Sequence, residues 1–317
     1  FFCYPFRMLC YNYNTVVKMY QSIYLLMGLI VMNIIDFSYN QLETEDSPAK
    51  DDFLSDFLQE YKRLCNISDE FTEKGIKTEI KKTDKNILQA NLHKTREILK
   101  KSEEKILRFF GDIEIPPVIL FIGPFAWDGH GILIKEKAYI FLNITMMEHH
   151  FNLPGFIPEV HAIHEIIHGI HYNIYPEFYP GNCKTIKELY FNKFLAEGIA
   201  TYLSGKINNS TSGEALSFGL MTDEDFHIWV NKCNSTKGEF SLLLNRAVTE
   251  NRYNDELWMS LFLIPDLKPD CLTRGRFGYY YGMKIAEMAS EKTGDTQLVK
   301  TPGEHFYPFV KDYFSEM

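Results

Sequence analysis

Residues 161–172 read HAIHEIIHGIHY and contain an HExxH motif, formed by His164, Glu165 and His168. On an α-helix, residues four apart lie about 40° apart around the axis and about 6 Å apart along it, so two imidazoles can converge on one metal ion. Glu165, about 100° from His164, lies beside that ion, where it can take a proton from a water that the metal activates. Pro158 lies just before a run with helical periodicity, and the apolar face of that run predicts a buried helix. That face comprises Ala162, Ile163, Ile166, Ile167 and Ile170.

A catalytic zinc site typically has three protein ligands and one open position, so a third ligand is required. The metzincin pattern places a histidine six residues after the second histidine, but this position is Ile174. His171 lies on the same face, yet about 10.5 Å along the axis from His164, too far to share one ion. His161 is disfavoured for the same reason. We expect His161 and His171 to act as hydrogen-bonding partners or to line a cleft wall.

The best third ligand is in residues 194–203, FLAEGIATYL, where Glu197 lies among small residues in a predicted helix. Small neighbours such as Gly198 allow a second helix to pack closely, so the carboxylate can reach the ion. Thr201, four residues later on the same face, can hydrogen-bond a ligand and fix its orientation. The alternative is a solvent-facing glutamate on a surface helix, which the apolar setting disfavours.

Residues 274–282, RGRFGYYYG, are the predicted source of an oxyanion donor. Peptide hydrolysis develops negative charge on the scissile carbonyl oxygen, and metalloproteases stabilise it with the metal and a Tyr or His donor. Tyr280 is the first candidate and Tyr279 the second; the alternative is that the tyrosines pack at a helix start. Arg274 or Arg276 could pair with a substrate carboxylate, although a surface position is the more common outcome for arginine.

HEIIH followed by AEGIATY resembles the gluzincin metallopeptidases, in which HExxH and a Glu on a later helix bind zinc. More narrowly, the chain is similar to an uncharacterised, largely bacterial family of predicted zinc-dependent proteases. The segments MNIIDFSYN, HEIIHGIHY, LAEGIATYL and FGYYYGMKIAEM occur in similar order there, so the resemblance covers roughly residues 32–317. It implies a zincin-like fold and a peptide or protein substrate. It also implies that the zinc ligands are His164, His168 and Glu197, with Glu165 as general base.

Two details follow from this resemblance. Many gluzincins have Asp four residues after the Glu ligand, where this chain has Thr201, and a hydroxyl orients a histidine more weakly than a carboxylate does. In gluzincin folds an edge strand beside the active-site helix can pair with extended substrate, and residues 138–144 fit by analogy; the alternative is an internal strand. Four residues receive no chemical role: Asp128 and His130, expected in a turn, and His149 and His150, expected in a loop.

The order of elements predicts an α+β fold, with a small mixed sheet, an active-site helix and a mainly helical C-terminal part. We expect helices at 51–65, 85–110, 158–171, 185–207 and 280–292, and strands at 116–121 and, as a pair, within 132–144. A turn-rich stretch, YPEFYPGNC, divides the chain into residues 32–175 and 176–317, preceded by residues 1–31.

Residues 1–31 contain no Asp or Glu, whereas the rest of the chain contains 42. The apolar run at 23–35 is shorter than the about 20 residues that a membrane-spanning helix needs. Residues 1–31 can be an extension preceding a start at Met32, a signal or anchor segment, or an ordinary buried segment. We expect a cytoplasmic protein, or a secreted or membrane-anchored one if residues 1–31 are a genuine signal or anchor. Membrane association is expected only if this segment is retained.

Charge and cysteine spacing exclude several classes of protein. Lys and Arg total 33 against 42 Asp and Glu, a net charge of −9 that argues against a nucleic-acid partner. The six cysteines form no CxxC pair, which argues against a thiolate zinc knuckle and indicates isolated thiols in a reducing compartment. Nothing in the sequence indicates an oligomeric state.

The main hypothesis is a zinc-dependent peptidase that uses a metal-activated water and a glutamate general base. The first alternative is a non-catalytic metal-binding regulatory or interaction protein on the same fold; the intact Glu165 argues against it. The second is a structural zinc site closed by a fourth ligand such as His171 or Cys183.

Overall fold

The computed structural model describes residues 32–43, 52–125, 127–263 and 275–315. The predictions about residues 1–31 and Arg274 lie outside these ranges. Within them, every helix is too short or too polar to cross a membrane. Three of the cysteines lie in the described part, and all three are free thiols: Cys65, Cys183 and Cys233.

The fold is α+β, as predicted: a small mixed sheet with helices before and after it. The strands are β1 (Ile34–Asp36), β2 (Val118–Phe121), β3 (Gly129–Ile134) and β4 (Lys137–Asn143). The helices before the sheet's last strand are α2 (Ser38–Glu43), α3 (Asp52–Cys65), α4 (Asp69–Lys82) and α5 (Lys85–Phe110). Those after it are α6 (Ile144–Phe151), α7 (Pro158–Ile174), α8 (Ile186–Asn208), α9 (Ser212–Ser217), α10 (Asp223–Thr249), α11 (Asp255–Phe262), α13 (Phe277–Thr293) and α14 (Tyr307–Ser315). Short 3-10 turns are η1 (Pro176–Phe178), η2 (Pro180–Asn182), η3 (Asp295–Lys300) and η4 (Gly303–Phe306).

The strands form one sheet in the order β1-β2-β4-β3. β1, β2 and β4 are parallel, and β3 runs antiparallel to β4. The prediction of an edge strand at residues 138–144 is wrong, because β4 has a partner on each side; β1 and β3 are the edge strands of the sheet. His130 lies in β3, where it pairs with Phe141 of β4, and not in the predicted turn. His149 and His150 belong to α6 rather than to a loop.

Each face of the sheet packs against helices, and side chains along β2 alternate between the two faces. Val118 and Leu120 join the large core that includes α5 and α7. Ile119 and Phe121 point to the other face and join a smaller cluster with α3. This period of two, with both faces buried, explains why the strand reads as a continuous apolar run.

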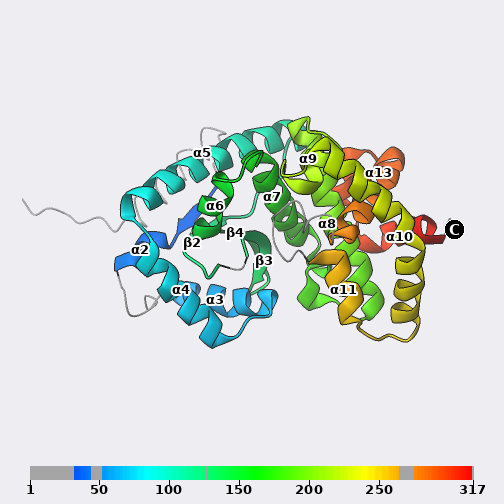
Figure 1. Cartoon of the computed structure of the whole chain (residues 1–317), viewed down its shortest axis with the longest axis horizontal. Coiled ribbons are helices and arrows are strands. Elements are labelled where there is room, and N and C mark those ends of the chain that lie inside the picture. Colours follow the sequence, from blue (N-terminus) through cyan, green and yellow to red (C-terminus); the bar gives the residue numbers. More distant parts are fainter. Residues whose placement is uncertain (1–31, 44–51, 126, 264–274, 316–317) are drawn as a thin grey trace, which may run out of the picture.

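Helix α7 lies at the centre of the molecule, between the sheet with its helices and the C-terminal helices (Figure 1). Pro158 begins it at the first helical position, where a missing N–H costs nothing. Every residue from 160 to 172 is buried. On one side α7 approaches β3 closely: a Cβ on Gly131 would lie 2.9 Å from the backbone N of Gly169.

Helix α8 packs across α7 and also against α13. The crossing of α8 and α13 has glycine on both sides: a Cβ on Gly198 would lie 2.0 Å from the carbonyl carbon of Gly282. The division expected after residue 175 falls at η1, and one hydrophobic cluster contains residues from both sides of it.

Replacing Gly198 by alanine is expected to force α8 and α13 apart and to lower the free energy of unfolding by about 3 kcal/mol. Gly205→Ala, in the same helix, is the control, because its added Cβ meets the Ala215 methyl at 3.0 Å and, of the described backbone outside its own helix, no atom closer than the Ser210 carbonyl oxygen at 3.9 Å. Chemical denaturation of both variants measures the difference. A Gly198→Ala variant as stable as the control would contradict the close crossing.

Candidate metal centre

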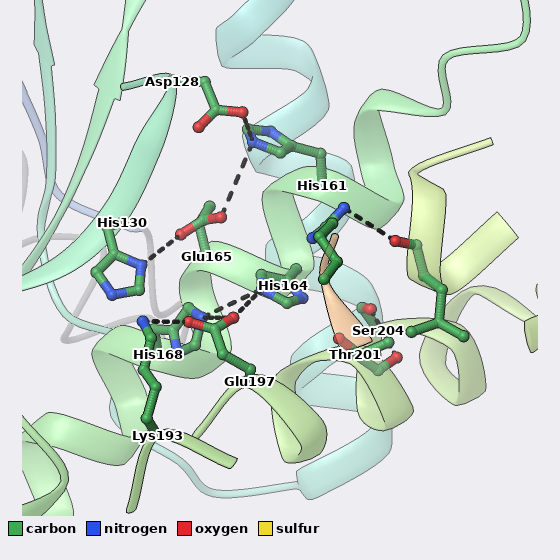
Figure 2. A network of polar contacts seen from close by, with 12 residues as sticks. Asp128, His130, His161, His164, Glu165, His168, Lys193, Glu197, Thr201 and Ser204 are labelled. Atoms are coloured by element: carbon green, nitrogen blue, oxygen red, sulfur yellow. Dashed lines mark hydrogen bonds and ion pairs between the residues drawn. The ribbon is translucent and has the colours of Figure 1, made fainter. Parts of the chain in front are cut away.

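Two side chains of α7 and one of α8 meet in the interior (Figure 2). The Nε2 atoms of His164 and His168 lie 3.1 Å apart. Glu197 Oε2 lies 3.3 Å from His164 Nε2 and 3.2 Å from His168 Nε2. The three predicted ligands are therefore brought together, with one atom of each at a corner of a nearly equilateral triangle.

This triangle has the size that a zinc site requires. Ligand atoms about 2.0–2.1 Å from zinc at tetrahedral angles lie about 3.3 Å from one another. Imidazole and carboxylate are also donors that zinc favours. The three side chains are at most 2% exposed, and their donor atoms could serve one ion. The residues therefore fit a zinc ion.

The protonation states suit a cation. Burial lowers the pKa of both His164 and His168, which keeps the rings neutral and their lone pairs available. Burial would raise the pKa of Glu197, but the charge of Lys193 and the contacts with His168 and His164 hold it well below its usual range. Lys193 Nζ lies 2.5 Å from Glu197 Oε1, which leaves Oε2 to face the histidines.

Glu165 lies beside this cluster without belonging to it. Its Oε2 is 3.4 Å from His130 Nδ1, and its Oε1 is 3.9 Å from His161 Nε2. The His130 ring also lies against His168, with centroids 4.4 Å apart. A carboxylate next to the triangle has the position that the sequence predicts for a general base. Glu165 also forms, with His130 and His168, a group of donor atoms close enough to hold a metal ion.

His161 is a hydrogen-bonding partner, one of the two roles predicted for it. Its Nε2 lies 3.0 Å from Asp128 Oδ2. Burial opposes the charged form of each, yet the contact lowers the pKa of Asp128 and raises that of His161. His171 has neither predicted role: its ring stacks on Phe178 at 3.9 Å, and burial lowers its pKa to about 3.

The late tyrosines separate into different environments. The Tyr280 hydroxyl donates to Asn234 Oδ1 at 3.3 Å, in the direction of α10. The Tyr279 ring stacks on His164, and its pKa is raised well above the usual value by burial and by the Glu197 charge. Tyr279, the second candidate, is therefore the tyrosine beside the cluster. Arg276 is buried rather than at the surface, with its guanidinium 3.9 Å from the centre of the Tyr279 ring.

Two other predicted contacts are not made. The Thr201 hydroxyl is buried and has no hydrogen-bond partner in the described part of the chain, so it does not orient a ligand histidine. The Cys183 thiol donates to the carbonyl oxygen of Glu177 at 3.7 Å. Among the described residues, neither Cys183 nor His171 belongs to any group that could hold a metal ion.

Sequence reasoning missed Lys193, His130 and Asp128. A signal existed for Lys193, which is four residues before Glu197 on the same helix face. His130 and Asp128 come from an edge strand and the loop before it, and only the fold brings them to α7.

No family model, curated protein or solved structure matches this chain.

Replacing Lys193 by glutamine leaves the Glu197 carboxylate buried without its nearest cation. Without metal, this variant is expected to lose about 3 kcal/mol of stability. Zinc is expected to raise its melting temperature more than that of the wild type, because the ion supplies the missing positive charge. Thermal unfolding with and without a chelator tests this, with the exposed Lys206→Gln of the same helix as control. Equal stability of both metal-free variants would contradict the ion pair.

Proposed function

We propose that this protein is a zinc-dependent peptidase with a gluzincin-type site on a zincin-like fold. The observation that carries the proposal is the triangle of His164, His168 and Glu197, whose sides of 3.1–3.3 Å suit one tetrahedral ion. Glu165 lies outside the triangle, in a neighbouring group with His130 and His168, and a carboxylate beside the ligands supports catalysis rather than mere binding. The zincin-like assignment is supported by the HExxH helix α7, packed against a sheet with an antiparallel edge strand.

Each residue then has a chemical task. Zinc held by the three ligands would polarise the scissile carbonyl and lower the pKa of a bound water. Glu165 accepts the proton of the attacking water and passes it to the leaving amine. Tyr279 donates its hydroxyl hydrogen to the developing oxyanion. His130 and His161 flank the Glu165 carboxylate, with ring nitrogens 3.4 Å and 3.9 Å from its two oxygens.

The depth of the centre favours a second candidate, a metal-binding regulatory or interaction protein without turnover. His164, His168 and Glu197 are almost completely buried, which suits a closed site. A surface hollow of about 360 Å³ is lined by α4 residues such as Glu73 and Lys77, none of which belongs to the centre. A peptidase must admit substrate to Glu165, whereas a regulatory metal site need only bind the ion. Turnover and metal binding, measured on the same variants, therefore separate the two candidates.

Glu165→Gln is expected to retain about one zinc in the triangle and to lower peptide hydrolysis by about 10²- to 10⁴-fold, because the amide cannot accept the proton. Elemental analysis and a fluorogenic peptide library measure the two properties. Glu197→Gln is the comparison, and it is expected to weaken zinc binding itself. Hydrolysis by the Glu165→Gln variant at the wild-type rate would remove Glu165 from the mechanism.

Tyr279→Phe is expected to lower kcat by about 10²-fold or more while zinc remains bound, because an oxyanion donor is lost. Tyr280→Phe is the matched control: the adjacent tyrosine loses the same atom and is expected to keep full activity. Steady-state kinetics on one peptide substrate compares the two. A larger loss for Tyr280→Phe would assign the donor role to Tyr280 instead.

A further inference from the structure

A second group of possible metal ligands lies near the start of α7, and it shares no residue with the triangle. It consists of Asp128 in the loop before β3, His150 in α6 and His161 in the first turns of α7. One donor atom from each lies within 4.8 Å of the other two. Figure 2 shows Asp128 and His161 pointing toward each other, on the far side of Glu165 from the triangle.

His150 is the side chain that the protein alone leaves unexplained. It is fully buried, and neither ring nitrogen has a hydrogen-bond partner in the described part of the chain. Its Nδ1 faces Asp128 Oδ2 at 3.7 Å, which is too long for a hydrogen bond. Buried polar atoms of folded proteins nearly always have a partner, so we expect His150 Nδ1 to have one that is not a protein atom.

The distances suit an ion between these atoms. Two ligands about 2.0–2.2 Å from one metal ion lie about 3–4 Å apart. The separations of Asp128 Oδ2 from His161 Nε2, 3.0 Å, and from His150 Nδ1, 3.7 Å, are both in this range. A hydrogen-bonded ion pair accounts for Asp128 and His161, but not for His150.

We propose that Asp128, His150 and His161 form a second site for a divalent transition-metal ion, separate from the triangle. Two imidazoles and one carboxylate suit borderline ions such as zinc better than calcium or magnesium, which prefer oxygen ligands. Binding releases the proton that His161 shares with Asp128, since a ligand nitrogen must carry a lone pair. Water can complete the coordination on the side of Asp128, the partly exposed ligand.

A metal ion bound at this site would connect three elements near Glu165. It joins the loop before β3, α6 and α7, and His161 Nε2 lies 3.9 Å from Glu165 Oε1. The second ion would therefore have a positioning role, by fixing His161 next to the carboxylate. Metal binding at this site does not depend on peptidase activity; only the positioning role of the ion rests on the proposed function.

Zinc stoichiometry of the full-length chain, by elemental analysis and calorimetric titration, tests the proposal. The wild type is expected to bind two zinc ions, and His150→Gln and His168→Gln one each. The double variant is expected to bind none. His149→Gln is the matched control, since His149 is the exposed neighbour of His150 in α6, and it is expected to keep both ions.

Asp128→Asn provides a second variant in case His150→Gln does not fold, because Asp128 is at the surface end of the group. It is expected to weaken one of the two binding events by at least about 100-fold. One zinc in the wild type, lost in His168→Gln and kept in His150→Gln, would overturn the second site and leave the peptidase proposal intact. One zinc lost only in His150→Gln would support the second site and overturn the triangle.

Discussion

Helix α7 buries several polar side chains, and the elements around it must provide their polar contacts. A helix buried along nearly its whole length satisfies its backbone internally, but its polar side chains need partners in the surrounding elements, and all of its imidazoles except His171 have a polar contact within the described part of the chain. β3 supplies His130, the preceding loop supplies Asp128, and α8 supplies Glu197 with Lys193. The elements around α7 are therefore fixed by polar contacts as well as by apolar packing.

These contacts require the backbones to lie unusually close. Gly131 of β3 lies against Gly169 of α7, and Gly198 of α8 lies against Gly282 of α13. A side chain at Gly131, Gly198 or Gly282 would separate the elements, because its Cβ would lie within 3 Å of backbone atoms of the neighbouring element. Gly131 thereby connects the fold to the site, because it sets the distance from which β3 and His130 reach α7, whereas Gly198 and Gly282 set the distance between α8 and α13.

Glu165 occupies the point where the two ligand groups meet. On one side it adjoins the triangle through His130 and His168, and on the other it adjoins His161. In such a buried setting, charges interact more strongly than they do in water, so the state of each group bears on the carboxylate. The same burial restricts the approach of a substrate, which is why the centre fits both a deep peptidase site and a closed binding site.

The sequence determined the parts of the site that depend on local geometry. The spacing of His164 and His168 places both on one face of a single helix, and no tertiary information is needed for that. The small residues around Glu197 predicted close packing against the HExxH helix; α8 does pack against α7, but Gly198 itself lies against Gly282 of α13. The long apolar patterns likewise predicted α5 and the buried strand β2.

Only the tertiary structure distinguishes residues or strands that look alike in the local sequence. Tyr279 and Tyr280 are adjacent and point about 100° apart, so the packing of α13 on α8 selects the one that faces His164. β3 and β4 are both apolar, because helices cover both faces of the sheet, and the sequence carries no sign of which is the edge. His130 and Asp128 reach α7 only through pairing and packing between residues distant in the chain. Such contacts leave no periodic trace in the sequence, and this is the physical reason that they could not be predicted.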